Sequence, residues 1–450
     1  MSITTSITSR CVRLIRSRFP FRYGLVIADQ AMLSGTSFVT SVVVARICAP
    51  AQFGLYVLGV AALLVLRELQ LGLVTGPMAV LGSMEDDVSF SRYVSPLIVL
   101  QMLVCLSAAA IAAVASIVVR AVSPSSPLPS ILGVLAVASI FIQAQEFCRR
   151  ILLVRFRLIR FLVNDGVFCL AQLGALGLAV WLKRQGGHAK FPASDVFLCQ
   201  AGAGAAALLV GAFQVRRFIT LRRCFRGEPL LMNWRFGRWN LLSSLCALAY
   251  QQTVYFVLAA LAGTTAVAQL EAPRLIVAPF MVLIMGWSTI VGPFAARKFT
   301  VEGLASTQAY LNRITRTFIL TVTLAIVPIS IFSGRIVPAL LGRSYTSGGT
   351  VLWVWSATVI MMAASSGYGA IFYAGRRPEQ GTLSRVVAAS LGLPIVCLLT
   401  FLWKVEGAAL ARLASEATLC LTAVWFGRRL RTTNMSHWES MDLDLAERAS

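Results

Sequence analysis

Two arginines lie far inside apolar stretches of the sequence. Arg67 follows Gly54 by thirteen residues, which is about 20 Å along a helix. Arg274 lies about nine residues into a second apolar run, 265–292. Charge is costly in hydrocarbon and is usually retained there for a function. A guanidinium stays charged when buried, and its planar donors match phosphate oxygens. Both arginines are therefore candidates for binding an anionic group.

Each of these arginines also has an acidic neighbour in the sequence. Glu271 lies one helical turn before Arg274, so the two side chains are spaced to meet on one helix face. A structural ion pair is thus an equal interpretation of Arg274. Glu68 adjoins Arg67 but points about 100° away around a helix, so Arg67 needs another partner or a ligand.

Other charged residues inside apolar runs are candidates for ion coupling or for structural ion pairs. Asp29 and Asp165 lie close to the ends of their runs, where solvation at the membrane interface is the simpler interpretation. Glu416 follows Arg412 by four residues, which favours a structural pair.

A polar run ends the fourth apolar stretch, Gln143-Ala-Gln145-Glu146-Phe-Cys-Arg149-Arg150. Glu146 and Arg150 are four residues apart and can pair. Arg149 opens a basic cluster whose expected role is to set topology and contact anionic lipid. First capture of a phosphorylated lipid is a less favoured hypothesis. The other members of the cluster are Arg150, Arg155, Arg157 and Arg160.

The composition excludes a soluble enzyme. Of the 450 residues, 58% are apolar and only 13% are charged, and the mean hydropathy is +0.78. Repeated apolar runs of this length are typical of an all-α polytopic membrane protein. The sequence predicts about twelve spans, at residues 24–47, 54–81, 93–119, 130–154, 161–182, 195–215, 239–262, 265–292, 314–333, 349–374, 381–403 and 406–427.

The basic residues indicate how the chain crosses the membrane. Although the formal charge of +22 is typical of nucleic-acid binding, the arginines fall between the apolar runs, so we expect no nucleic-acid partner. Alternate connections carry roughly four times more Lys and Arg on one side than on the other, which predicts that both termini are cytoplasmic. Only the loop with Glu85, Asp86 and Asp87 is acidic on that side.

The sequence offers little material for catalysis or for metal binding. The ten cysteines are scattered without a CxxC pair, and His188 and His437 are the only histidines. We therefore expect neither an enzyme nor a metal site, and no cofactor.

The longest connection divides the predicted spans into two halves. Residues 216–238 contain seven arginines and are predicted to be a basic cytoplasmic linker. The predicted domains are an N-terminal six-helix lobe (1–215), a C-terminal six-helix lobe (239–431) and a polar cytoplasmic tail (432–450).

One motif resembles a known family. The stretch from Ala45 to Tyr56, Ala-Arg-Ile-Cys-Ala-Pro-Ala-Gln-Phe-Gly-Leu-Tyr, resembles a signature of Wzx-like polysaccharide and oligosaccharide flippases. These belong to the multidrug/oligosaccharidyl-lipid/polysaccharide (MOP) exporter superfamily. The sequence differs from the signature at Ala49, usually glycine, and at Ala51, usually acidic. The run at 143–150 and the stretch Ala268-Gln-Leu-Glu-Ala-Pro-Arg-Leu275 also resemble family patterns.

The resemblance implies two lobes around a central cavity and a function in the bacterial inner membrane. That function is translocation of a lipid-linked oligosaccharide or exopolysaccharide precursor by alternating access, with coupling to a proton or sodium ion. The cargo would be a polyprenyl-pyrophosphate-linked sugar. Arg67 and Arg274 would meet its phosphates, while Gln251 and Gln252 either bind sugar hydroxyls or bridge helices. Membrane lipids and polysaccharide polymerase or assembly proteins are the expected partners.

Three other functions are considered. A multidrug cation antiporter of the same superfamily predicts an acid-lined cavity, whereas Arg67 lies deep in its run. A membrane-bound glycosyltransferase or polymerase requires large loops or catalytic carboxylate clusters, and the longest connection holds only one acidic residue, Glu228. A non-transporting component of a polysaccharide assembly complex is not excluded by any sequence feature.

Overall fold

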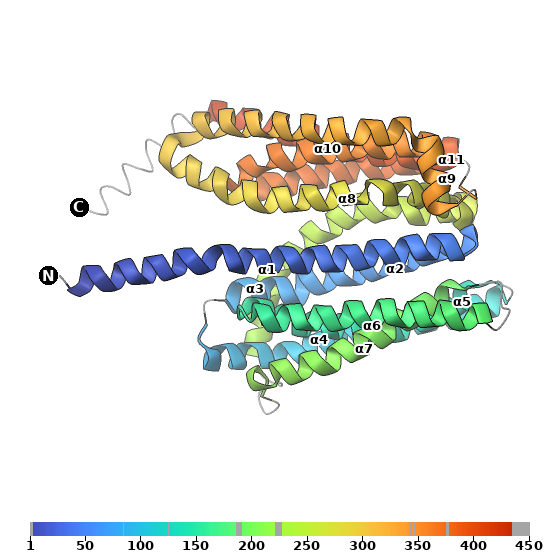
Figure 1. Ribbon diagram of the computed structural model, residues 1–450, viewed down its shortest axis with the longest axis horizontal. Coiled ribbons are helices and arrows are strands. Elements are labelled where there is room, and N and C mark those ends of the chain that lie inside the picture. The colour runs from blue at the N-terminus through green and yellow to red at the C-terminus, as the bar shows by residue number, and fades with distance from the viewer. Residues whose placement is uncertain are drawn as a thin grey trace. The chain divides into compact units, whose positions relative to one another are not determined.

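The computed structural model describes residues 3–433 except 84, 125, 186–190, 221–226, 343, 346–347 and 375–377. Every regular element in this part of the chain is a helix (Figure 1). In chain order the elements are α1 (Ile3–Ile47), α2 (Pro50–Gln70), the π-helix η1 (Leu71–Thr75), α3 (Gly76–Leu81), α4 (Asp87–Val122), α5 (Leu128–Val154), α6 (Leu158–Gln185), α7 (Ala193–Val215), the 3₁₀ turn η2 (Arg216–Phe218), α8 (Glu228–Ile331), α9 (Ser333–Leu341), α10 (Gly348–Ala374) and α11 (Pro378–Thr433).

Ten helices in the described ranges are long and apolar enough to cross a membrane. Two of them contain a break, because Gly263 in α8 and Lys404 in α11 have positive φ angles of 80° and 48°. When these two helices are divided at their breaks, the described ranges give twelve segments, the number that the sequence predicts, and the segment before Gly263 begins at Gln251 instead of residue 239. A further break in α8 lies at Gly303.

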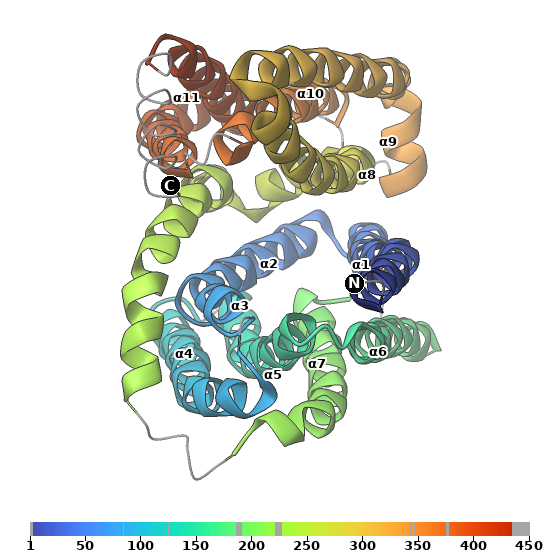
Figure 2. The same ribbon diagram turned by 90° about the vertical axis from the view of Figure 1, so that its left-hand side faces the viewer.

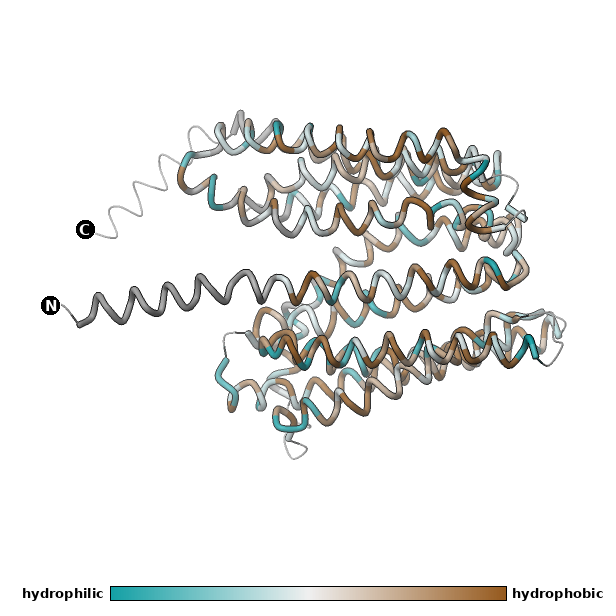
Figure 3. The backbone as a smooth tube through the Cα atoms, viewed as in Figure 1, coloured by the Kyte–Doolittle hydropathy of each residue, from teal (hydrophilic) through white to brown (hydrophobic). Residues whose placement is uncertain are grey.

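The outer surface of the helices is apolar. Large aliphatic side chains such as Ile111, Leu170 and Leu209 are more than two thirds exposed. Hydrophobic colouring runs along the helices, while hydrophilic residues are frequent near helix ends (Figure 3). Monomeric soluble proteins rarely expose so much contiguous apolar surface, whereas lipid tails solvate it without cost. The predicted all-α membrane architecture is confirmed.

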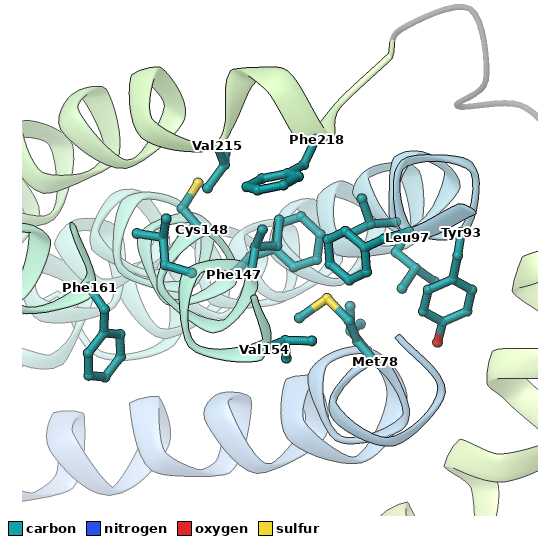
Figure 4. Close-up of a cluster of buried hydrophobic side chains, with 14 residues drawn as sticks. Met78, Tyr93, Leu97, Phe147, Cys148, Val154, Phe161, Val215 and Phe218 are labelled. Atoms are coloured by element: carbon teal, nitrogen blue, oxygen red, sulfur yellow. The ribbon is translucent and has the colours of Figure 1, made fainter. Parts of the chain in front are cut away.

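The chain divides into two compact units, Met1–Ser244 and Leu245–Ser450. In the first unit α5 packs between α4 and α7, and α6 packs against α1 and α7 (Figure 2). Large buried side chains fill the space between α3, α4, α5 and η2, among them Met78, Leu97, Phe147 and Phe218 (Figure 4). This core fixes α5, which carries the polar run of residues 143–150.

The second unit has its own core, formed by α8, α10 and α11. Buried Val291 and Leu311 of α8 pack with Phe372 of α10 and Ala423 of α11. Beside them the rings of Trp287 and Phe318 stack with centroids 4.2 Å apart. The predicted boundaries of the two lobes and the cavity between them stay predictions.

The start of α8, up to Ser244, belongs to the first unit and packs against η1. Pro77 has no N–H, so it cannot donate to the carbonyl of Leu73 four residues earlier. Asn233 Nδ2 of α8 donates to this carbonyl instead, and Tyr93 Oη donates to Asn233 Oδ1 over 2.7 Å. The helices approach closely because Gly237 has no side chain: a Cβ there would lie 2.9 Å from the carbonyl oxygen of Gly72.

Three segments predicted to lie outside the membrane spans can be compared with the structure. The predicted connection at residues 48–53 is shorter in the structure: only Cys48 and Ala49 separate α1 from α2, because Pro50 begins the second helix. The predicted linker 216–238 contains η2 and the first turns of α8, and its residues 221–226 lie outside the described ranges. The predicted tail lies outside them from residue 434.

Candidate functional site

A buried arginine gathers three carboxylates in the first unit. The Arg149 guanidinium of α5 contacts Asp165 Oδ2 of α6 at 2.5 Å and Asp29 Oδ2 of α1 at 3.0 Å. It also contacts Glu146 Oε2, one turn earlier on α5, at 3.1 Å. The side chains of Arg149, Asp29 and Asp165 are 7%, 2% and 0% exposed. We call these four residues the Arg149 cluster; it joins three helices.

Local helix geometry brings these groups together. Glu146 lies three residues before Arg149 and four before Arg150, so both guanidinium groups reach its carboxylate. The Glu146–Arg150 pair that the sequence spacing allows forms, with a contact of 2.6 Å. The ring of Phe161 covers the Arg149 guanidinium at 4.7 Å. Since burying a charge is costly unless it is paired, this site requires all of its partners.

A layer of amides surrounds the Arg149 cluster. Gln145 Nε2 donates to Asn164 Oδ1 over 2.8 Å and to Asp165 Oδ1 over 3.2 Å. Asn164 Nδ2 in turn donates to the carbonyl of Ala207 on α7 over 2.7 Å. Gln172 of α6 donates to Thr40 Oγ1 of α1 over 3.0 Å. The amides therefore hold α1, α5, α6 and α7 in register around the charges.

A cavity of about 240 Å³ lies beside this cluster, between α1, α2, α5, α6 and α7. Arg149, Asp165 and Glu146 line it together with Arg67 of α2. The Arg67 side chain is 48% exposed, and its guanidinium lies 4.0 Å from Glu146 Oε1. Arg67 is thus loosely paired and keeps donors available for another anion.

Two of the sequence interpretations are wrong at this site. Asp29 and Asp165 were expected to be solvated near helix ends, but both are buried against Arg149. Arg149 was expected to contact lipid as part of a surface cluster, and it is buried instead. Arg155, another member of the predicted basic cluster, pairs with Asp87 at the start of α4. Asp29, Asp165 and Arg149 can be buried because their opposite charges, carried by α1, α6 and α5, pair with one another.

The second unit holds a separate polar network. Arg274 Nε donates to Glu271 at 2.7 Å, the pair that the sequence spacing allows. Tyr255 Oη donates to Glu271 Oε2 over 2.8 Å, and Trp355 lies with its ring 6.0 Å from the Arg274 guanidinium. Arg274 is only 29% exposed. These contacts support the structural interpretation of Arg274, and its contact with cargo stays a prediction.

The remaining candidates are placed as follows. Arg412 contacts Glu416 at 2.8 Å on α11, the predicted structural pair. Gln251 and Gln252 are partly buried on α8. Glu68 is partly buried and takes no part in the ion pairs of the described chain. The roles predicted for the last three in binding or coupling stay predictions.

The sequence reasoning missed the cavity-lining amides. Gln143, Gln145, Gln172 and Gln200 all line the cavity, but only the first two stand in a run that had drawn attention. Each is a polar residue inside an apolar helix, and this is the signal that could have found them. Nothing in the linear sequence brings α5, α6 and α7 together.

No protein-family model matches the sequence, and no curated protein matches it. Solved structures do resemble it. A multidrug resistance MATE family transporter of the MOP superfamily, in an inward-facing conformation, has a TM-score of 0.71 and 13% identity. The alignment covers 90% of this chain and 96% of that one. The chain has the fold of MOP superfamily transporters.

Two further structures share this fold. The lipid II flippase MurJ, in an inward closed conformation, has a TM-score of 0.67 and 11% identity over 90% of this chain and 87% of its own. A MOP superfamily transporter from Pyrococcus furiosus Vc1, described as having a binding pocket of reverse polarity, has a TM-score of 0.64 and 13% identity. The coverage is 91% of this chain and 95% of that chain.

Proposed function

We propose that the protein translocates a polyprenyl-diphosphate-linked saccharide, such as an exopolysaccharide precursor, across the bacterial inner membrane by alternating access. The observation that carries this proposal is Arg67. Its half-exposed guanidinium lines a cavity and lies 4.0 Å from Glu146, farther than the guanidinium groups of Arg149 and Arg150. The MOP transporter fold supports it as well, since one protein with this fold is a lipid II flippase. Charge-assisted hydrogen bonds from a guanidinium fit phosphate oxygens.

We further propose that the Arg149 cluster couples transport to protons. Asp29 Oδ1 is buried and accepts no hydrogen bond from the described chain, although Asp29 Oδ2 contacts Arg149. Arg149 and Arg150 bring two positive charges against three carboxylates there, so one bound proton would balance the charge of this group when Arg67 turns from Glu146 to the cargo. A sodium ion fits less well, because the guanidinium already lies among the carboxylate oxygens. Protonation at this position would loosen the attachment of α1 to α5.

A second candidate is export of an organic cation. The three carboxylates of the Arg149 cluster favour it, and so does the fold shared with MATE family transporters. Against it, Arg149 already pairs with all three carboxylates. A cationic cargo would have to displace a buried guanidinium, which is costly.

Flipping by the purified protein in vesicles tests the proposal. A fluorescent polyprenyl-diphosphate oligosaccharide is added, and its leaflet is measured with an impermeant quencher, with and without a proton gradient. We expect Arg67→Ala to slow flipping about tenfold, the effect of losing about 1.4 kcal/mol of binding. Arg67→Lys retains part of the rate because it keeps the charge.

The matched control is Arg120→Ala, since Arg120 is exposed at the end of α4 and does not line the cavity. It should flip lipid like the wild type. Flipping at the wild-type rate by Arg67→Ala would contradict the proposed role of Arg67. Ethidium export without lipid flipping would favour the cation transporter, and a rate independent of the proton gradient would contradict the coupling.

A further inference from the structure

Two glutamines that line the cavity have unused hydrogen-bonding atoms. Gln143 of α5 is 3% exposed, and its Nε2 is buried without a hydrogen-bond partner in the described chain. Gln200 of α7 lines the same cavity, and its Oε1 is likewise buried and unpartnered among the described residues. One helix thus provides a free donor and another a free acceptor.

Such atoms require an explanation. A buried polar atom without a partner destabilises the folded protein, and native proteins contain few of them. A hydroxyl group both donates and accepts hydrogen bonds. A ligand with several hydroxyls could therefore satisfy the Gln143 donor and the Gln200 acceptor together.

The rest of the lining suits a ring with one apolar face. Tyr56 of α2 and Phe168 of α6 contribute aromatic rings, and Leu63 and Leu64 add aliphatic surface. The Tyr56 ring is supported by Phe197, with ring centroids 5.5 Å apart. A sugar ring has C–H groups that pack on aromatic faces and hydroxyls at its edge, so it matches both kinds of lining.

Size and charge narrow the choice of ligand. The cavity volume of about 240 Å³ is below the roughly 300–1,000 Å³ of pockets that hold drug-sized ligands. Its three carboxylates are matched by three guanidinium groups, because Arg149 contacts Asp29, Asp165 and Glu146 while Arg150 and Arg67 also lie against Glu146. A small uncharged ligand therefore fits better than a drug cation or a whole oligosaccharide.

We propose that this cavity binds a single uncharged sugar ring, the one joined directly to the diphosphate of the cargo. The proposal rests on the proposed function, in which Arg67 meets that diphosphate. Arg67 lines the same cavity as Gln143 and Gln200, so the phosphate and the first sugar would bind next to each other. Specificity for the first sugar then comes from α5 and α7, while affinity for the lipid comes from α2.

Equilibrium binding to the full-length protein in nanodiscs tests this. The probes are polyprenyl diphosphate and the same lipid bearing one hexose or one N-acetylhexosamine. We expect the wild type to bind one sugar-bearing lipid about tenfold more tightly than the bare lipid. Gln143→Leu and Gln200→Leu should each remove most of this preference. Arg67→Ala should weaken binding of both lipids by a similar factor.

Gln214→Leu is the matched control. Gln214 also lies on α7 with a buried oxygen that has no partner in the described part of the chain, but it does not line the cavity. It should keep the wild-type preference. Gln143→Leu and Gln200→Leu should unfold at or above the wild-type temperature, because each removes an unsatisfied buried atom.

The outcomes separate the two proposals. Equal affinity of the wild type for the bare and both sugar-bearing lipids would overturn the sugar site and leave the proposed function standing. Absence of binding to every lipid would overturn the proposed function and the sugar site with it. A preference that survives in both folded Gln143→Leu and Gln200→Leu would also overturn the sugar site.

Discussion

Arg149 shows at the scale of a residue how strongly one buried charge depends on its partners. Replacing it by Leu leaves Asp29, Asp165 and Glu146 without their shared guanidinium. Removing one partner of a buried ion pair typically costs about 3–5 kcal/mol. We therefore expect Arg149→Leu to lower the unfolding midpoint sharply in detergent, and Arg149→Leu combined with Asp165→Leu to recover part of the loss.

Arg150 supplies the comparison for this prediction. It is 24% exposed and contacts Glu146, which Arg149 also contacts. Arg150→Leu should cost no more than about 1 kcal/mol, the usual range for a pair near the surface. If Arg149→Leu is no more harmful than Arg150→Leu, the cluster does not hold α1, α5 and α6 together as inferred.

Pairs within one helix could be predicted from the sequence, but contacts between helices could not. The spacing of Glu146 and Arg150, of Glu271 and Arg274, and of Arg412 and Glu416 indicates which side chains share a helix face, and all three pairs form. Asp29 and Asp165 meet Arg149 across 120 and 16 residues of sequence. Spacing alone carries no information about such meetings, so both aspartates were assigned to the interface.

At the scale of elements, the junction of η1 and α8 explains how an irregular helix is stabilised. η1 lies immediately before α3, which begins with Gly76-Pro77. The missing N–H of Pro77 leaves the Leu73 carbonyl to be satisfied by Asn233. The sequence did not predict this contact, because Asn233 is 160 residues away from Leu73.

We expect Asn233→Leu to destabilise the first unit by about 1–3 kcal/mol, because the partly buried Leu73 carbonyl loses its hydrogen-bond donor. Tyr93 Oη also loses its acceptor in this variant. Pro77→Ala restores a backbone N–H for Leu73, so the double variant should be more stable than the sum of the single changes predicts. The measurement is a double-mutant cycle on unfolding in mixed micelles.

Asn240→Leu is the matched control for this cycle. Asn240 Nδ2 donates to the Leu71 carbonyl over 3.3 Å, but this carbonyl also accepts a hydrogen bond from the Gly76 N–H. Its loss should cost less than the loss of Asn233. Strict additivity of Asn233→Leu and Pro77→Ala would show that Asn233 does not replace the missing N–H.

At the scale of the whole molecule, apolar run lengths were sufficient to predict the architecture. The predicted runs at 24–47 and 130–154 end where α1 and α5 end, because Ile47 and Val154 are followed by residues that interrupt the apolar pattern. The breaks at Gly263 and Lys404 fall between predicted runs, at 262–265 and 403–406. The short helix α9 was missed, since nine residues are too few to give a membrane-length signal.

The distribution of positive charge makes a prediction about the orientation of the whole chain. Since basic loops remain on the cytoplasmic side, the α5–α6 connection with Arg155 and Arg157 should be cytoplasmic and the α4–α5 connection at Ser123–Pro127 should be outside. Green fluorescent protein fused after Arg157 should therefore fluoresce, and alkaline phosphatase fused after Ser123 should be active. Phosphatase activity in a fusion after Arg157, with none in a fusion after Ser123, would show that the chain has the opposite orientation. The loop between α3 and α4 is the stricter test. Its Asp86 and Asp87 make it acidic, although the alternation of helices requires it to be cytoplasmic. A fluorescent protein fused in this loop should fluoresce if the basic residues of the other loops determine the orientation.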